Sequence, residues 1–330
     1  MILVTGGAGY IGSHTCVELI NAGQKIVIVD NFCNSERNVI DTIQSITGSS
    51  VVCVDADVRD KDKLTQVFQK YPISAAIHFA GHKAVGESVA KPLSYYQNNI
   101  DSTLALCEVM DAHDVQTLIF SSSATVYDST NEMPLDEDSS LGCTNPYGWT
   151  KLINEQILRD LSVSSDKWSI VSLRYFNPIG AHKSGKLGER PTGIPNNLMP
   201  YIAQVASGKR DKLHVFGNDY PTIDGTGVRD YIHVVDLAEG HVRALEYASK
   251  GNGAQSINLG SGTGYSVLQI INAFEQATNI NIPYVIDPRR PGDIATCFAK
   301  TDKAKQLLGW QTQRSLAQMC EDSWRFESQL

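Results

Sequence analysis

Residues 2–12 read Ile2-Leu3-Val4-Thr5-Gly6-Gly7-Ala8-Gly9-Tyr10-Ile11-Gly12, an apolar run followed by closely spaced glycines. The run predicts a buried strand, and residues 10–21 after it predict a helix. Glycines at such a junction allow a tight turn, and their missing Cβ atoms let a pyrophosphate approach the unpaired N–H groups of the helix. The stretch predicts the first unit of a dinucleotide-binding fold, although glycines alone would fit any tight turn.

Acidic residues follow the next two predicted strands. Residues 25–29 predict a strand that ends at Asp30, about 18 residues after Gly12. A carboxylate there accepts hydrogen bonds from a ribose 2′-hydroxyl and repels a 2′-phosphate, which favours NAD over NADP. Residues 51–54 predict a strand leading to Asp57, which could receive the adenine amino group. A solvated acidic loop is an equally good interpretation of Asp57 from the residues alone.

The chain then alternates between strands and helices. Further strands are predicted at 75–79, 117–120 and 169–174, each separated by a helical stretch, which completes six β units. This alternation predicts an α/β fold with a Rossmann-type, doubly wound parallel sheet. We expect an NAD-binding domain over residues 1–178 and a smaller C-terminal α/β substrate lobe over 179–330, of which about 228–262 packs back onto the domain. Residues 180–195 predict a loop that could close over a ligand.

Composition and charge limit the kinds of ligand that the protein is expected to bind. The formal net charge is −8 and no run of Lys and Arg appears, which argues against nucleic acid but allows a small phosphate ligand. The seven Cys form no Cys-x-x-Cys pair, and the eight His show no metal-ligand spacing. We therefore expect free thiols in a reducing cytoplasm and no metal. The apolar residues 1–5 are too short for a signal segment or a membrane span, so no membrane association is expected.

A second motif carries the chemistry. Residues 145–151, Asn145-Pro146-Tyr147-Gly148-Trp149-Thr150-Lys151, predict a helix start with a phenol and an ammonium one turn apart. The ammonium should lower the pKa of the phenol, which could then take a proton from a sugar or alcohol hydroxyl. Upstream, a strand runs into Ser121-Ser122-Ser123, hydroxyls at the edge where open α/β sheets bind ligands. An exposed amphipathic helix and a Ser-rich turn are the alternatives for each motif alone.

Together these motifs resemble the extended short-chain dehydrogenase/reductase family. More narrowly, essentially the whole chain is similar to the UDP-glucose/UDP-galactose 4-epimerases. Besides the glycine turn and Asp30-Asn31, the similarity rests on residues 78–88 (HFAGHKAVGES), 120–127 (FSSSATVY), 174–178 (RYFNP) and 225–233 (GTGVRDYIH). Two departures stand out, namely Asp128, where the family usually has Gly, and Trp149, where a smaller, polar or basic residue is usual.

The resemblance implies an NAD-dependent isomerase that inverts C4 of a UDP-hexose through a transient 4-keto sugar. It implies that Tyr147 is the acid and base, that Ser123 hydrogen-bonds the 4-hydroxyl, and that Lys151 binds the nicotinamide ribose. The implied cofactor-binding positions, besides Tyr147 and Lys151, are Gly6, Gly9, Tyr10, Ile11, Gly12, Asp30, Asn31, Asp57, Val58, Phe79, Ala80, Gly81, Lys83, Asn98, Ser121 and Tyr175. The implied substrate positions, besides Ser123, are Asn177, Asn197, Leu198, Phe216, Arg229, Arg290, Asp293 and Cys297. Two guanidiniums suit a diphosphate, and a carboxylate suits ribose hydroxyls.

Cys297 bears on the choice of sugar. The family members restricted to glucose and galactose resemble one another in having Tyr at this position, and members that accept N-acetylated sugars have a smaller residue. A thiol leaves room for an acetamido group, so we expect UDP-N-acetylglucosamine and UDP-N-acetylgalactosamine as further substrates. Another side chain could equally fill that space. The resemblance also implies a homodimer that pairs helices near residues 93–112 and 146–163.

Neighbouring functions make different demands on the sequence. Nucleotide-sugar dehydratases and decarboxylases resemble this chain but carry acidic residues where Ala124 and Thr125 stand, so elimination of water is disfavoured. A 4-epimerase of a UDP-uronic acid, or another NAD-dependent nucleotide-sugar modifier, is the enzymatic alternative. A uronic acid would call for an extra cation near the hexose, and none is evident. A cofactor-sensing binding protein would have no need for Ser123, Tyr147 and Lys151 together.

Overall fold

The computed structural model describes residues 1–191, 193–251, 253–290 and 292–330. Its largest element is a parallel sheet built by strands β1 (Ile2–Thr5), β2 (Ile26–Asp30), β3 (Val52–Asp55), β4 (Ala75–His78), β5 (Thr117–Ser123), β6 (Ser169–Tyr175) and β10 (Ala254–Leu259). The order is β10-β6-β5-β4-β1-β2-β3, and every pair is parallel. The order reverses between β1 and β4, which confirms the predicted doubly wound sheet and creates a crevice at the carboxyl ends of these strands.

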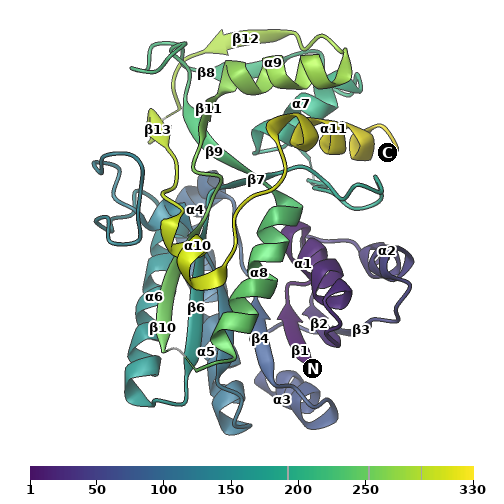
Figure 1. Cartoon of the computed structure of the whole chain (residues 1–330), viewed down its shortest axis with the longest axis vertical. Coiled ribbons are helices and arrows are strands. Elements are labelled where there is room, and N and C mark those ends of the chain that lie inside the picture. Colours follow the sequence, from purple (N-terminus) through teal and green to yellow (C-terminus); the bar gives the residue numbers. More distant parts are fainter. Residues whose placement is uncertain (192, 252, 291) are drawn as a thin grey trace.

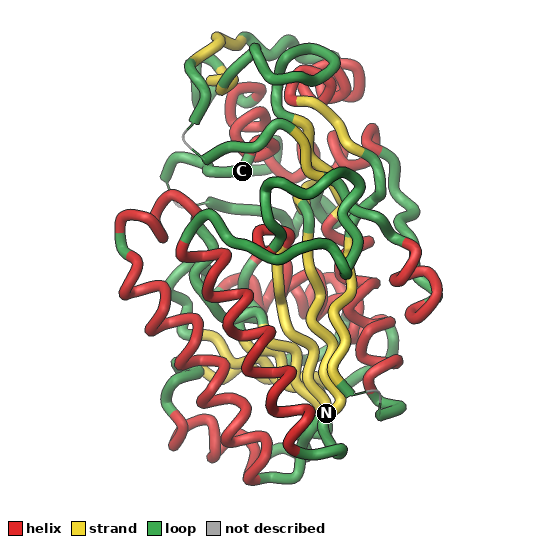
Figure 2. The backbone as a smooth tube through the Cα atoms, turned by 90° about the vertical axis from the view of Figure 1, so that its left-hand side faces the viewer, coloured by secondary structure: helices red, strands yellow, loops and turns green. Residues whose placement is uncertain are grey.

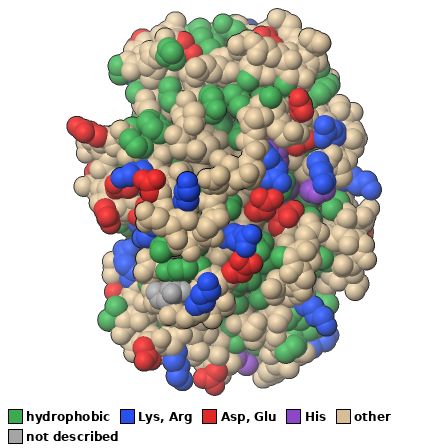
Figure 3. Space-filling view, in the orientation of Figure 1, with side chains coloured by type: hydrophobic (Ala, Val, Ile, Leu, Met, Phe, Trp, Pro, Cys, Tyr) green, Lys and Arg blue, Asp and Glu red, His purple; other side chains and the backbone are tan. Residues whose placement is uncertain are grey.

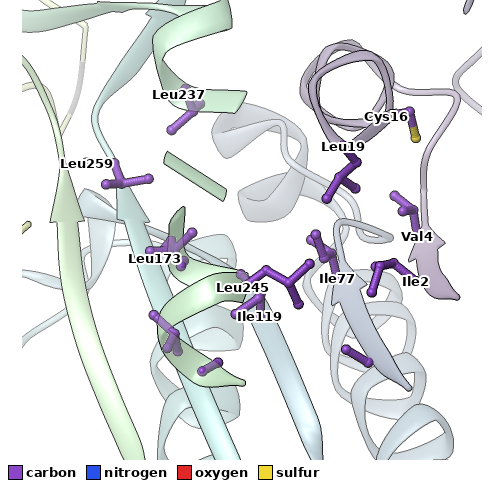
Figure 4. Close-up of a cluster of buried hydrophobic side chains, with 14 of the residues drawn as sticks. Ile2, Val4, Cys16, Leu19, Ile77, Ile119, Leu173, Leu237, Leu245 and Leu259 are labelled. Carbon is purple, nitrogen blue, oxygen red and sulfur yellow. The ribbon is translucent and has the colours of Figure 1, made fainter. Parts of the chain in front are cut away.

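Helices cover both faces of this sheet (Figure 1). They are α1 (Tyr10–Asn21), α2 (Asn38–Thr47), α3 (Lys61–Lys70), α4 (Val85–Ala90), α5 (Pro92–Ala112), α6 (Pro146–Ser164) and α8 (Val234–Ala248). Side chains along a strand alternate between the two faces of a sheet. Successive strand residues therefore belong to two different apolar clusters, one on each face. Ile2 and Val4 pack with Leu19 of α1 and Leu245 of α8 (Figure 4), whereas Leu3 packs on the other face with residues of α3, α5 and α6.

The smaller lobe lies at one end of the sheet (Figures 1 and 2). Its strands are β7 (Asn177–Ile179), β8 (Leu213–Phe216), β9 (Val228–His233), β11 (Gly264–Ser266), β12 (Tyr284–Asp287) and β13 (Thr296–Cys297), and its helices are α7 (Leu198–Ala206), α9 (Val267–Thr278) and α11 (Leu316–Glu327). Helix α10 (Asp302–Leu308) instead packs against α8 and β10 and contributes Ala304 and Leu308 to the core of the large sheet. Strand β9 pairs with β7, β11 and β13. The chain then returns through α8 and β10 to the large sheet, so the two parts are interleaved in sequence.

The predicted end of β5 was wrong by three residues. The strand expected to end at residue 120 continues through Ser123, because β5 and β6 stay paired from Thr117↔Ser169 to Ser123↔Tyr175. The short helix η1 (Ala124–Val126) follows at once. The Ser run is therefore the last part of a buried strand, not a turn, and this places it at the carboxyl edge of the sheet.

The face of the molecule that Figure 3 shows gives little sign of a polyanion-binding surface. Figure 3 shows acidic and basic side chains interspersed on the face in view. Within the described ranges, no helix combines the length and apolar character that crossing a membrane requires. In the predicted loop 180–195, where Thr192 lies outside the described residues, Leu187 is only 3% exposed and belongs to the core of the large sheet.

Candidate active site

The glycine turn fits a diphosphate. A Cβ at Gly6, where φ is +68°, would lie 2.7 Å from the backbone nitrogen of Ala80, and a Cβ at Gly12 would lie 2.4 Å from the Gly6 carbonyl oxygen. Only glycine can therefore build this close approach. Helix α1 begins after Gly9, and no side chain caps it. Its first N–H groups remain available to an anion, as a dinucleotide requires.

Hydrogen bonds from neighbouring groups orient the carboxylates of Asp30 and Asp57. Asp30 ends β2, is 8% exposed, and accepts hydrogen bonds from the backbone nitrogens of Ala8 and Phe32, both at 2.9 Å. Asp57 accepts two side-chain bonds from Arg59, at 2.9 and 2.8 Å, and these bonds lower the pKa of Asp57 to about 2. Asn31 donates to the same carboxylate at 3.2 Å. The structure thus brings Asn31 and Asp57, two of the predicted cofactor positions, together.

A buried aromatic group faces the next part of the crevice. Tyr175 donates a short hydrogen bond to Nε2 of His241, whose ring lies 4.9 Å from that of Phe79. Nδ1 of His241 lies 2.8 Å from the carbonyl oxygen of Leu237 and must carry the proton. Burial lowers the pKa of His241 to about 4, so the imidazole is neutral. Nothing in the sequence singled out His241, since its partners lie far away along the chain.

The remaining cofactor positions lie around this crevice. Lys83 forms an ion pair of 2.9 Å with Glu189, and Tyr10 donates to the Gly180 carbonyl at 2.6 Å. Asn98 contacts its neighbour Asn99 through a 3.2 Å hydrogen bond. The contacts of Lys83 and Tyr10 link the loop after β4 and the start of α1 to residues 180–191.

The predicted catalytic residues converge at the end of β5. Asn145 caps α6 by accepting a 2.9 Å bond from the Gly148 backbone nitrogen, and Tyr147 and Lys151 follow one turn apart. Lys151 is 5% exposed and donates a 2.6 Å bond to the Ser121 carbonyl, with its Nζ 5.9 Å from the centre of the Tyr147 ring. Ser123 lies two residues beyond Ser121 and is 9% exposed.

The protonation of this group differs from the sequence-based expectation. Burial raises the pKa of Tyr147, and a hydrogen bond with Ser123 acts in the opposite direction. Burial also lowers the pKa of Lys151 to about 8. The lowering of the phenol pKa by Lys151 that the sequence predicted is therefore not found: burial raises this pKa, and the contact that opposes burial is the hydrogen bond with Ser123.

The substrate positions gather on the smaller lobe. Asp293 forms ion pairs with Arg229 of β9 at 2.6 Å and with Arg290 at 3.1 Å. The Arg290 guanidinium also lies 4.8 Å from the centre of the Phe216 ring. Four of the predicted residues thus form one cluster with two guanidiniums. Pro291, which separates Arg290 from Gly292 in the sequence, lies outside the described residues.

The other substrate positions lie on strands and a helix start next to the crevice. Asn197 directly precedes Leu198, the first residue of α7, and donates a 2.8 Å bond to Glu189, the partner of Lys83. Asn177 opens β7. Cys297 is partly buried in β13, opposite Arg229 in register, and packs against the apolar cluster that contains Phe176 and Ala299.

The two departures from the family pattern have simple local roles. Asp128 accepts bonds of 2.8 Å from both the backbone nitrogen and the hydroxyl of Thr130, so it shapes a turn. Trp149 is 42% exposed and points away from the core on α6. Neither residue contacts the Ser123–Tyr147–Lys151 group through a hydrogen bond.

A Rossmann-type sheet with a glycine turn, a carboxylate after β2 and a buried Ser–Tyr–Lys group defines a nucleotide-dependent short-chain dehydrogenase/reductase type of protein. The family model for the NAD dependent epimerase/dehydratase family matches residues 2–260. The chain belongs to this family.

The chain is similar to characterised relatives over almost its whole length. It is 59% identical over 327 residues to the UDP-glucose 4-epimerase of Bacillus subtilis. The aligned region covers 99% of this chain and 96% of that protein. The crystal structure of a UDP-glucose 4-epimerase from Bifidobacterium longum with NAD+ and UDP superposes with a TM-score of 0.96 at 52% identity, covering 99% of this chain and 98% of that one. A second crystal structure is that of the UDP-glucose-4-epimerase from Stenotrophomonas maltophila with bound NAD and formylated UDP-arabinopyranose. It superposes with a TM-score of 0.97 at 50% identity, and covers 99% of this chain and 98% of that one.

Proposed function

We propose that the protein is an NAD-dependent 4-epimerase that interconverts UDP-glucose and UDP-galactose. The observation that carries this proposal is the convergence of Ser123, Tyr147 and Lys151 at the carboxyl end of β5, on a sheet that also holds the uncapped glycine turn. Relatives named UDP-glucose 4-epimerase align with the whole chain, and two of their structures hold NAD together with UDP or a UDP-sugar.

The residues of the chain handle the proton. NAD, when bound along the glycine turn and Asp30, supplies the acceptor and then the donor of hydride at C4 of the sugar. Tyr147 takes the proton of the 4-hydroxyl when C4 is oxidised and returns it when C4 is reduced on the opposite face. Ser123 hydrogen-bonds the same hydroxyl. The Lys151 ammonium stabilises the Tyr147 phenolate that is present before C4 is oxidised and again after the proton has been returned.

The smaller lobe holds the nucleotide. Arg229 and Arg290 offer their guanidiniums to the diphosphate, and Asp293 accepts hydrogen bonds from the uridine ribose. Both guanidiniums already pair with Asp293, so the cluster is assembled in advance. Firm binding of UDP with a loosely held hexose lets the keto sugar turn over within the site, which inversion requires.

Room beside the hexose extends the substrates to the N-acetylated pair, UDP-N-acetylglucosamine and UDP-N-acetylgalactosamine. Cys297 is smaller than a tyrosine, and burial raises the pKa of its thiol to about 11, which leaves it neutral at physiological pH. The Cys297→Tyr substitution should abolish activity on N-acetylated sugars and spare the other pair, and Cys297→Ser should keep both. Equal loss on both pairs in Cys297→Tyr would refute this role.

We also propose a cytoplasmic homodimer. The described helices α4 to α6 expose Val89, Leu93 and Val163, which are 64%, 75% and 85% exposed, and the cysteines are free, as expected in a reducing compartment. Leu93→Asp should convert the dimer to a monomer in light scattering after size exclusion. Ile223→Asp, at a residue that is 82% exposed but lies on the smaller lobe, should leave the dimer intact.

The test of the activity is a product assay. The purified protein, without added cofactor, receives UDP-galactose and UDP-N-acetylgalactosamine in separate tubes, and NMR identifies the products. Turnover of both supports the full proposal, and turnover of UDP-galactose alone removes the N-acetylated substrates. No turnover even with added NAD would overturn the function. Tyr147→Phe is the control and should lose at least about a hundredfold in kcat.

A further inference from the structure

A buried ion pair lies on α6 directly behind the proposed catalytic group. Glu155 stands one turn after Lys151 and is 1% exposed, and Arg174 of β6 is 2% exposed. Arg174 grips both carboxylate oxygens of Glu155, with Nε to Oε1 at 3.0 Å and Nη2 to Oε2 at 2.7 Å. Such a bidentate pair fixes orientation as well as charge.

The pair connects the three elements that carry the proposed reaction. Ser122 of β5 donates a 2.5 Å bond to Glu155, and Ser122 and Arg174 are partners in register. Each of these residues is next to a site residue in sequence. Ser122 lies between Ser121, whose carbonyl holds Lys151, and Ser123, while Arg174 precedes Tyr175. Any shift of Glu155 therefore changes the position of α6 relative to both strands.

Among the described residues, few charged or titratable groups lie near Lys151 and Glu155. Within the described ranges, Lys151 faces Tyr147 and Glu155 of its own helix and His78 of β4. Glu155 faces Arg159 of its own helix, Arg174, and Cys143 of the loop before α6, and it shares a cavity with Glu137 and with Lys303 of α10. Burial keeps His78 and Cys143 neutral, since it lowers the pKa of His78 to about 3 and raises that of Cys143 to about 12.

Glu155 is thus the carboxylate that acts on Lys151. Burial lowers the pKa of Lys151 to about 8, and the negative charge of Glu155 opposes this fall. Although burial alone would raise the pKa of Glu155, its bonds with Arg174 lower it, so the carboxylate stays ionised. Loss of this charge would make Lys151 release its proton at a lower pH.

We propose that Glu155 is a positioning residue that acts through Lys151. Its carboxylate, held by Arg174 and Ser122, fixes α6 against β5 and β6 and sustains the ammonium that proton transfer at Tyr147 requires. The proposal rests on the proposed epimerase function and adds a residue to the same site.

The test compares pH profiles of the NAD-loaded enzyme. Glu155→Gln should move the alkaline limb of kcat on UDP-galactose to lower pH, so that activity falls by roughly tenfold more at pH 8.5 than at pH 6.5. KM should change little, because Glu155 is remote from the UDP cluster. An alkaline limb that stays at the wild-type pH would overturn the proposal.

Two further variants separate charge from folding. Glu155→Gln leaves Arg174 buried without its charged partner, which destabilises the fold, whereas Glu155→Gln/Arg174→Met removes both charges. The double variant should recover thermal stability and still show the shifted limb. Asp236→Asn is the matched control, because this fully buried carboxylate pairs with Arg314 away from the site. It should lower the Tm and leave the pH profile unchanged.

A second readout needs no turnover. Between about pH 8 and 10.5 the unfolded chain holds a Lys151 proton that the folded chain has released, so the contribution of Lys151 to the Tm rises with pH. In Glu155→Gln this rise should begin at lower pH. Suppose that the wild type turned over no UDP-galactose while the pH at which the rise begins were still lower in Glu155→Gln. In that case the epimerase function would fail, and the effect of Glu155 on Lys151 would stand. If the rise did not move, the positioning role would fail.

Discussion

Lys151 places an ammonium beside the rings of Phe120 and Tyr147, 5.0 and 5.9 Å from their centres. Burial lowers its pKa from 10.5 to about 8, so at pH 7 the folded protein bears the cost of an almost fully buried charge. Below pH 8 both the folded and the unfolded chain are protonated, and this cost is fully present. It diminishes as the pH rises towards 10.5, where both states are neutral.

Lys151→Met should therefore remove activity and raise stability. At pH 7 we expect kcat to fall by at least about a hundredfold, while the Tm rises by on the order of 2 to 4 °C. The difference in Tm between variant and wild type should shrink between pH 8 and 10.5. Lys167→Met, at a lysine that is 66% exposed, should change neither quantity. A lower Tm for Lys151→Met at pH 7 would mean that its bond to Ser121 outweighs the cost of burial.

Gly12 shows how tightly the turn is built. A Cβ there would lie 2.4 Å from the Gly6 carbonyl oxygen and 2.9 Å from the Gly7 Cα, and backbone atoms cannot move aside cheaply. Gly12→Ala should cost about 1–3 kcal/mol of stability and reduce the NAD that copurifies with the protein. Thermal unfolding and the absorbance of released nucleotide measure both. Gly86→Ala, which meets nothing within 4 Å, should retain its NAD and a wild-type Tm or better.

At the scale of elements, the start of α6 sets where Tyr147 stands. Asn145 accepts from the Gly148 nitrogen at 2.9 Å, and Pro146 follows at the first helical position. Asn145→Ala should cost about 1 kcal/mol and also lower kcat several-fold, because the first turn carries the phenol. Ser315→Ala removes the equivalent cap of α11 and should cost similar stability without changing kcat. Equal kcat in both variants would show that the cap does not position Tyr147.

The elements that could be predicted from sequence are those with local signals. The glycine turn, the apolar run of β1 and the pairing of Tyr147 with Lys151 on one helix face all depend on neighbours within a few residues. The end of β5 was missed because its Ser residues resemble a turn, and only pairing with β6 keeps them in a strand. His241 and Glu155 were missed for a related reason. Their partners Tyr175 and Arg174 lie on a strand that chain folding alone brings near.

At the scale of the molecule, the site joins two cores. The proposed cofactor positions lie on the large sheet, while Arg229, Arg290 and Asp293 lie on the smaller lobe, which has its own apolar cluster around Ile202 and Phe274. The chain crosses between the parts at β6–β7 and returns through α8. A ligand that touches both should therefore stabilise the molecule as a unit.

Arg229 tests this coupling of the lobes. UDP at about a hundred times its Kd should stabilise the NAD-loaded wild type by about 2.7 kcal/mol, since it binds only the folded state. Arg229→Ala removes a guanidinium that we assign to the diphosphate, so the rise in Tm with UDP should largely vanish while the rise with NAD persists. Arg243→Ala, at an exposed arginine of α8 paired with Glu246, should retain both responses. A full UDP response in Arg229→Ala would place the diphosphate elsewhere, whereas loss of both responses would mean that the lobes cannot bind their ligands independently.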